Sequence, residues 1–150
     1  MPDDESTLEF YRTVDGDEPV YRWIFSDLDA PRRRALVLAL EHILRARGVG
    51  VCGTEYGRHL GHGLFEFRLR HDEVALRNRL RLPSLEPAGS RRRSSTLLRV
   101  FCHAHGDRVI LLLGGYDKGS DPSRRRQQRE IALARRRLDD FLARRRGRQV

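Results

Sequence analysis

Two stretches of this chain have an unambiguous pattern of apolar and polar positions. From Leu64 to Arg70 apolar and charged residues alternate strictly, which predicts a strand with different residues on its two faces. Phe65, Phe67 and Leu69 form the apolar face, and Glu66, Arg68 and Arg70 form the charged face. Val109–Leu113 is instead a continuous apolar run, typical of a strand covered on both faces at the centre of a sheet. We therefore expect one packed face that leaves two arginines and a carboxylate displayed on the other.

The apolar run belongs to a predicted hairpin. Leu97–Ala104 is predicted to be its first strand, and His105–Arg108 supplies the turn, in which Gly106 is free to adopt a positive φ. Gly114 and Gly115 are expected to end the second strand. This hairpin is the part of the sheet around which we expect the remaining elements to pack.

The N-terminal third predicts a strand followed by two helices. Leu8–Val14 is rich in aromatic and β-branched residues, which favours a first strand. Asp17 is a candidate cap for a helix that has Pro19 near its first position. Asp29, Ala30 and Pro31 give a second start signal, and apolar residues at helical spacing extend that helix to about Arg47. The short connection predicts a helical hairpin.

The two middle connections have weaker signals. Val49–Gly63 is a glycine-rich connector without a phosphate-loop motif. In Asp72–Ser95, a short helix from Val74 to Leu82 is followed by an expected basic loop that contains Arg91, Arg92 and Arg93. Such a long loop in a compact domain is typically functional or disordered.

The last predicted element is a helix from about Pro122 to Arg146, capped by Ser120 or Asp121. The elements predict a single α+β domain over residues 1–150, with a basic insertion at about 72–95. We expect a mostly antiparallel, twisted sheet with the helices packed against one side.

The charge of the chain indicates a class of binding partner. The chain has 30 Lys and Arg residues against 21 Asp and Glu, a net charge of +9, and Lys118 is its only lysine. The first 30 residues are acidic and the last 31 are basic. A basic face favours a polyanionic partner such as nucleic acid, and arginine suits bidentate phosphate contacts. The alternative is a solvated arginine-rich helix with no partner.

Cysteine usage and hydropathy bear on whether disulfides or a zinc site are expected and on the cellular compartment. Cys52 and Cys102 have no CxxC spacing, so neither a disulfide framework nor a zinc site is expected, and Cys102 is predicted to be a core residue. The sequence has neither the apolar segment of a signal peptide nor a spanning apolar run, which favours a cytoplasmic protein.

Four segments in order resemble one known family. His59–Arg70 resembles its Leu-Gly-x-Gly-Leu-aromatic-Glu strand, Leu98–Phe101 its next strand, and Ile110–Lys118 its apolar strand ending in an aromatic residue and lysine. Pro122 and Glu130–Arg137 are similar to its last helix. This order of motifs resembles the RelE/ParE toxin superfamily, in particular its phage-derived, HigB-like branch, and implies that fold for about Leu8–Leu142.

The resemblance implies the toxin of a type II toxin–antitoxin system, an endoribonuclease that needs neither metal nor cofactor and cleaves mRNA on the ribosome. The antitoxin partner in this branch is often a helix-turn-helix protein, and no membrane is involved. The reaction is attack of a ribose 2′-OH on the adjacent phosphate. It needs a base, positive charge near the phosphate oxygens, and an acid for the leaving 5′-oxygen.

Candidate residues follow from the charged strand face together with the resemblance. Arginine suits the charge-stabilising role because it stays protonated. The expected catalytic residues are Arg68, Arg99, Lys118 and His71, and the expected RNA-binding residues are Arg70, Tyr116, Arg91, Arg92 and Arg93. His71 is the first choice for the base, with His103 and His105 as alternatives. Glu66 shares the arginine face and is expected to pair with Arg68 or Arg70.

Two other functions stay open. ParE-like relatives share the fold but inhibit DNA gyrase without cutting nucleic acid, and this chain has Gly119 where the family has a second lysine. The third possibility is a nucleic-acid-binding module on the same fold that has lost activity, to which the Arg91–Arg93 loop is suited. The alternative is that Arg68, Arg70 and Arg99 are ordinary arginines on the sheet surface with no role in binding or catalysis.

Overall fold

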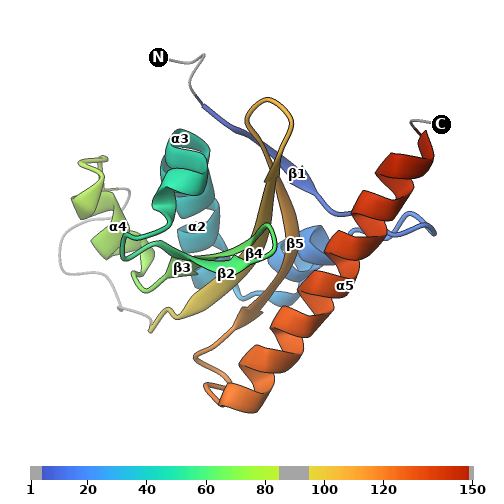
Figure 1. The fold of residues 1–150 in the computed structure, drawn as a ribbon. Helices are drawn as coiled ribbons and strands as arrows, with labels where there is room; N and C mark the ends of the chain where they lie inside the picture. Colours follow the sequence, from blue (N-terminus) through green and yellow to red (C-terminus); the bar gives the residue numbers. More distant parts are fainter. Residues whose placement is uncertain (1–4, 85–94, 149–150) are drawn as a thin grey trace.

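The computed structural model describes residues 5–84 and 95–148 and forms an α+β fold with a five-stranded sheet (Figure 1). The strands are β1 (Thr7–Phe10), β2 (Gly57–Gly61), β3 (Leu64–Leu69), β4 (Leu98–His105) and β5 (Val109–Asp117). The helical elements are α1 (Pro19–Arg22), η2 (Trp23–Asp27), α2 (Ala30–Ala39), η3 (Leu40–Leu44), α3 (Arg45–Arg47), η4 (Gly48–Val51), α4 (Glu73–Arg79) and α5 (Arg124–Arg148). The predicted fold class is confirmed.

The sheet has the order β1-β5-β4-β3-β2. Only β1 pairs in parallel, with β5, and the other three pairings are antiparallel. The apolar run of β5 therefore lies inside the sheet, as its pattern predicts. The side chains of Ile110 and Leu112 enter one core cluster, and those of Leu111 and Leu113 enter the other.

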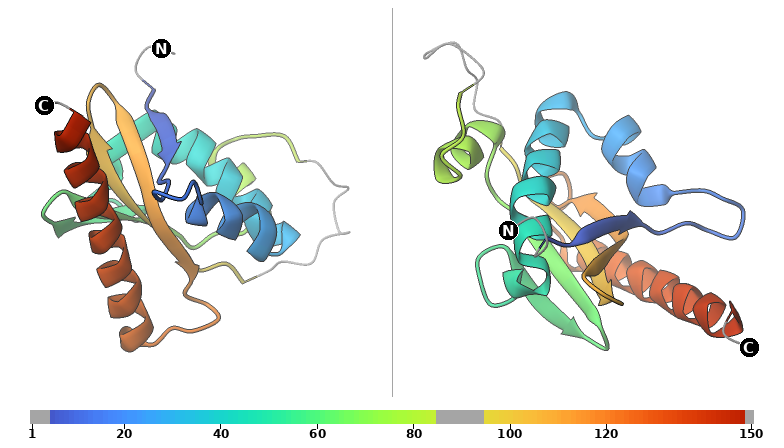
Figure 2. Two further views of the ribbon diagram at one scale, coloured as in Figure 1. Left: turned by 90° about the vertical axis from the view of Figure 1, so that its right-hand side faces the viewer. Right: turned by 90° about the horizontal axis from the view of Figure 1, so that it is seen from above.

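Helices cover both faces of the sheet, so the expectation of helices on one side is wrong. The N-terminal helices α1 to α3 lie on one face, and α5 runs diagonally across the other (Figures 1 and 2). Ala134 and Leu138 of α5 pack with Phe101 and Leu113. The reason is that β4 and β5 are apolar on both faces, so one layer of helices would leave half of that surface in water.

The predicted start of α2 is confirmed, but the predicted cap of the first helix is not. Asp29 accepts a hydrogen bond from the backbone N–H of Arg32 at 2.9 Å, as an N-cap does. Asp17 lies one residue too early to cap α1, because Glu18 occupies the N-cap position. The Asp17 carboxylate instead forms an ion pair with Arg22.

Strand β5 does not end at Gly114 and Gly115 but continues to Asp117. Both glycines pair with β4, Gly114 with Phe101 and Gly115 with Val100. A Cβ atom at Gly115 would lie 2.4 Å from the ring of Trp23, so glycine at this position admits the indole to the sheet. β1 is correspondingly shorter than predicted and ends at Phe10.

Of the two regions between the central elements, the first contains a strand that the sequence does not predict, and the second contains the short helix that it does predict. The glycine-rich connector includes the strand β2, which pairs with β3 through Arg58 and Glu66. The predicted short helix is α4, capped by Asp72, whose Oδ1 accepts from the backbone N–H of Ala75 at 2.9 Å. Arg91, Arg92 and Arg93 lie outside the described residues.

The cap of α5 also differs from the prediction. The hydroxyl oxygen of Ser123, rather than a side chain at Ser120 or Asp121, accepts a hydrogen bond from the backbone N–H of Arg126 at 3.1 Å. Asp121 makes a different contact just before the helix, where its Oδ1 accepts a hydrogen bond from the backbone N–H of Ser123. In the described parts of the chain, no helix combines the length and apolar character needed to cross a membrane.

Candidate functional site

A cluster of charged side chains lies on the α5 face of the sheet, towards the N-terminal end of that helix. The pairing of the strands brings these side chains together. Arg58 of β2 lies opposite Glu66 of β3, Arg68 of β3 lies opposite Arg99 of β4, and Arg99 lies opposite Tyr116 of β5. Residues directly opposite each other on neighbouring strands share a face and have closely spaced side chains. Four strands therefore contribute one residue or more to a single patch.

Glu66 is the centre of this patch. Its Oε2 lies 2.6 Å from Nε of Arg58 and 3.9 Å from Nε of Arg68, and its Oε1 lies 3.0 Å from Nε of Arg99. The Glu66 side chain is fully buried, whereas 45% of the Arg58 side chain is exposed. We call Glu66 with these three arginines the arginine cluster. Among residues 5–84 and 95–148, Glu66 is the only carboxylate within ion-pairing distance of the three, so the cluster has excess positive charge.

The charges of the arginine cluster are incompletely paired as well as buried. Only 3% of the Arg99 side chain is exposed, and its Nε faces Glu66 at close range without the alignment of a hydrogen bond. Burial lowers the pKa of Arg99, and the Glu66 carboxylate opposes that effect. Burial likewise lowers the pKa of Arg68. A desolvated guanidinium that lacks a full set of acceptors gains from an incoming anion.

Tyr116 adds a buried hydroxyl beside the arginine cluster. Its ring stacks on Phe101 with centroids 6.2 Å apart, and the guanidinium of Arg126 lies 5.2 Å from its ring centroid. Among the described residues, the Tyr116 hydroxyl has no hydrogen-bond partner. Burial, and then the nearby Glu66, raise the pKa of Tyr116, so its hydroxyl keeps its proton at neutral pH and remains a donor.

Arg126 comes from the first turn of α5 and is held by Glu130, whose Oε1 is 2.9 Å from its Nε. The N-terminal end of α5 thus reaches the candidate site. Neither Arg126 nor Arg58 is distinguished in the sequence, because Arg126 is one of many arginines in its helix and Arg58 lies in a connector without strand periodicity. Only pairing with β3 brings Arg58 to Glu66.

Lys118 and Arg70 lie at the edge of the arginine cluster. Lys118 follows β5, and its backbone N–H donates to the carbonyl of Leu97 at 2.8 Å. Burial, and next the charge of Arg99, lower the pKa of Lys118. The charge of Arg70 lowers the pKa of both Arg68 and Arg99. The structure therefore brings together five of the predicted site residues: Arg68, Arg70, Arg99, Tyr116 and Lys118.

His71 is not brought into this group. Its Nε2 lies 3.4 Å from Oε1 of Glu55, and its ring meets that of Tyr56 edge-on, with centroids 6.2 Å apart. Tyr56 belongs to the core on the opposite face of the sheet. The reason is strand alternation, which directs position 71 away from the side of positions 66, 68 and 70.

The two alternative histidines lie towards the other end of α5. The Nδ1 of His103 is 2.7 Å from the carbonyl oxygen of Gly63, and the His105 ring stacks on that of His103. His105 also contacts Phe141 and Arg145, near the C-terminal end of α5. They do not reach the arginine cluster, which among the described residues has Tyr116 and Lys118 as its proton-carrying groups besides arginine.

Chemically, the arginine cluster can bind a phosphate group between fixed guanidinium donors while a phenol and an amine lie alongside. In the described part of the chain, no three or more His, Cys, Asp or Glu side chains are grouped so that they could hold a metal ion. Comparison with known proteins found no family model, no curated protein and no solved structure that matches this chain.

Proposed function

We propose that this protein is a RelE/ParE-like toxin of a type II toxin–antitoxin system, a metal-independent endoribonuclease that cleaves mRNA on the ribosome. The observation that carries the proposal is the convergence of Arg58, Arg68 and Arg99 on one buried carboxylate. Beside it lies the hydroxyl of Tyr116, which has no hydrogen-bond partner among the described residues. The order of sequence motifs that resembles the HigB-like branch supports it independently. The same resemblance supports cytoplasmic action and a helix-turn-helix antitoxin as partner.

In this proposal the arginine cluster binds the scissile phosphate. Attack by the 2′-OH places additional negative charge on the non-bridging phosphate oxygens in the transition state. Guanidinium groups that are already oriented and partly desolvated stabilise that charge with little reorganisation. Glu66 orients Arg58 and Arg99 before substrate arrives, and the phosphate then supplies the acceptors that one carboxylate cannot.

The proton transfers are assigned to Lys118 and Tyr116. A lysine whose pKa is lowered has a larger neutral fraction, which accepts the proton of the 2′-OH. The Tyr116 hydroxyl donates its proton to the departing 5′-oxygen, and the tyrosinate is reprotonated afterwards. The products are a 2′,3′-cyclic phosphate and a 5′-hydroxyl, so the cleavage step consumes no water.

The test is mapping of RNA 5′ ends after brief induction of the wild type and of Arg68→Ala, Tyr116→Phe and Arg136→Ala. Arg136 is exposed on α5 and serves as the control for loss of one arginine. We expect new ends within reading frames for the wild type and Arg136→Ala. Arg68→Ala and Tyr116→Phe should reduce them at least about tenfold, because each loses a group that acts in the transition state.

Two other results would contradict the ribonuclease proposal and indicate a different function. If the wild type stops growth without creating new ends, a non-catalytic toxin with a gyrase-type target explains it better. If it neither stops growth nor cuts RNA, the protein is better described as a nucleic-acid-binding module on this fold. Circular dichroism of each purified variant establishes that it is folded.

A further inference from the structure

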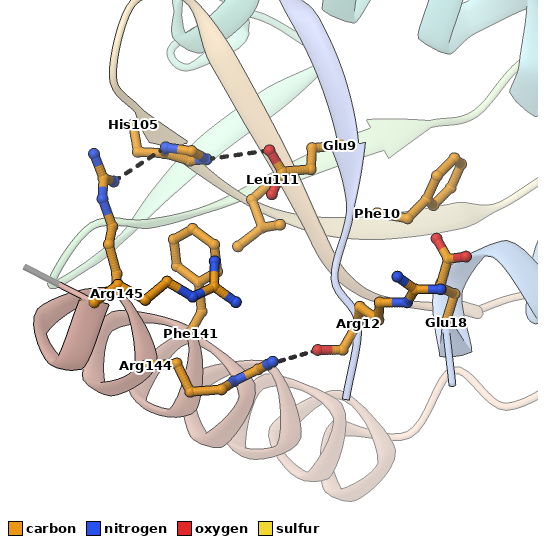
Figure 3. Close-up of a pocket in the computed structure, with 10 residues that line it drawn as sticks. Glu9, Phe10, Arg12, Glu18, His105, Leu111, Phe141, Arg144 and Arg145 are labelled. Atoms are coloured by element: carbon orange, nitrogen blue, oxygen red, sulfur yellow. Dashed lines mark hydrogen bonds and ion pairs between the residues drawn. The ribbon is translucent and has the colours of Figure 1, made fainter. Parts of the chain in front are cut away.

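A concave site lies between β1, the far end of the β4–β5 hairpin and the C-terminal end of α5. It is a pocket of about 660 Å³, a size that suits a small-molecule ligand (Figure 3). The residues that line it include Glu9, Glu18, His105, Phe141, Arg145 and Arg148. We call it the α5 C-terminal pocket.

This pocket is separate from the arginine cluster. Arg126 of α5 covers Tyr116 at the cluster, whereas Arg145 of the same helix reaches His105 at the pocket. With a rise of about 1.5 Å per residue, the backbone positions of these two arginines are roughly 28 Å apart along the helix. A ligand in the pocket is therefore outside the site proposed for RNA cleavage, and the inference does not rest on that function.

The pocket wall has more positive than negative charge. Arg12, Arg144, Arg145 and Arg148 line it, together with the carboxylates of Glu9 and Glu18. Arg144 is already engaged, because its Nη2 donates to Asp140 at 2.6 Å. Arg145 donates to Nδ1 of His105 at 3.1 Å, which is an uncharged acceptor when the imidazole is neutral. Because this acceptor carries no negative charge, it does not neutralise the guanidinium of Arg145, which can therefore pair with an anionic ligand.

His105 contributes a hydrogen-bond donor to the same wall. Because its Nδ1 accepts from Arg145, the proton of the neutral imidazole resides on Nε2. This Nε2 is buried and has no hydrogen-bond partner among the described residues, and Oε2 of Glu9 is 3.8 Å away. Burial lowers the pKa of His105, which favours this neutral form. Figure 3 shows His105 and Arg145 together at one side of the pocket.

An apolar surface completes the pocket. Phe141 and the buried Leu111 line it, and the Phe141 ring lies 5.0 Å from the His105 ring. A flat ring can stack on Phe141 while an attached anion reaches the arginines. Glu9 and Glu18 are acceptors suited to an exocyclic amino group or to sugar hydroxyls.

We propose that the α5 C-terminal pocket binds a nucleotide, with its phosphate at Arg145 and Arg148 and its base against Phe141. A nucleotide has an anion to pair with the arginines, a flat ring to stack on Phe141, and donor groups that can bond to Glu9 and Glu18. A free nucleoside monophosphate and a nucleotide within an RNA chain have this chemistry in common. The experiment distinguishes these two sources.

The experiment is isothermal titration of the full chain with AMP, with inorganic phosphate and with a short single-stranded RNA. The test variant is Arg145→Gln/Arg148→Gln. The control is Arg136→Gln/Arg146→Gln, which removes the same charge from exposed positions of the same helix. We expect the test variant to weaken binding of AMP or RNA by about tenfold or more, because charge-assisted hydrogen bonds are lost. The control should bind as the wild type does.

A third variant separates ring stacking from charge. Phe141→Leu keeps an apolar side chain but removes the ring, so it should weaken AMP more than inorganic phosphate. Saturable AMP binding that follows this pattern supports a free nucleotide as ligand. Binding of RNA alone with the same dependence on Arg145 and Arg148 supports a nucleotide within a chain.

The proposal is overturned if neither AMP nor RNA binds, if inorganic phosphate binds as tightly as AMP, or if the control variant loses as much affinity as the test variant. Arg68→Ala provides the link to the first proposal. It should reduce RNA cleavage at least about tenfold without changing AMP binding to the pocket, so the two proposals can fail separately.

Discussion

At residue 66 a fully buried carboxylate lies among three guanidinium groups. Burial of a charged group is costly unless its partners neutralise and hydrogen-bond it, and here one negative charge serves three positive ones. Glu66 is therefore required for the fold to tolerate Arg99 on the α5 face of the sheet. The same arrangement leaves positive charge available to an anion, which links the stability of this residue to the proposed activity.

Replacement of Glu66 by Gln tests this link. It should lower the free energy of unfolding by about 3 kcal/mol, because removal of one partner leaves buried charge uncompensated. Inorganic phosphate should then raise the melting temperature of Glu66→Gln more than that of the wild type, because it supplies the missing negative charge. Thermal denaturation with and without phosphate measures both effects.

Glu41→Gln is the matched control, since Glu41 pairs with Arg45 at an exposed position of the N-terminal helices. Exposed pairs contribute about 1 kcal/mol or less, so this variant should be nearly as stable as the wild type and should show no added response to phosphate. An equal response of all three proteins to phosphate would contradict the view of the arginine cluster as an anion site.

At the scale of elements, two neighbouring glycines in β5 differ in how closely other side chains pack against them. A Cβ at Gly115 would lie 2.4 Å from Trp23, whereas a Cβ at Gly114 would meet Phe101 at 3.5 Å, an ordinary contact. Gly115 thus allows the N-terminal helices to approach the strand that carries Tyr116.

Gly115→Ala should destabilise the protein by about 1 to 3 kcal/mol, because the Trp23 ring must move within a packed core. Gly114→Ala should cost less, since the added methyl group fits at van der Waals distance. Trp23 is the only tryptophan in the chain, so its emission reports the displacement directly during chemical denaturation. Equal destabilisation of both variants, without a change in emission, would show that this packing does not control the approach.

At the scale of the whole molecule, the net charge of +9 is unevenly distributed. The arginine cluster lies on one face of the sheet with α5, whereas Arg22 lies on the opposite side and pairs with Asp17. A single-stranded RNA on the first face releases counterions for each phosphate contact, and the binding constant then falls with salt. Salt dependence therefore tests the proposal that arginines on this face contact RNA.

Arg68→Ala should reduce the slope of log affinity against log salt concentration by about 0.7, the value for one phosphate contact on a single strand. Arg22→Ala removes the same charge from the opposite face and should leave the slope unchanged. Fluorescence anisotropy with a labelled RNA between 50 and 200 mM salt, about the range in which such slopes are measured, gives both values. Equal changes in the two variants would indicate attraction by net charge alone.

Much of the fold is predictable from the sequence because its signals are local. Strict alternation marks β3, an apolar run marks the interior strand β5, and the capping residue Asp29 marks the start of α2. These patterns depend on neighbours within a few residues. Alternation also places Arg68 and Arg70 on one face with Glu66, which accounts for the part of the candidate site that the sequence predicts.

The sequence by itself thus determined most of the element types, the α+β class and a charged strand face. Only the tertiary structure decided that α5 covers this face, that β2 exists and brings Arg58 to Glu66, and that His71 packs on Tyr56 instead. The physical reason is that burial and charge neutralisation depend on residues distant in the chain. Periodicity can assign a residue to a face, but which element covers that face depends on the packing of the whole molecule.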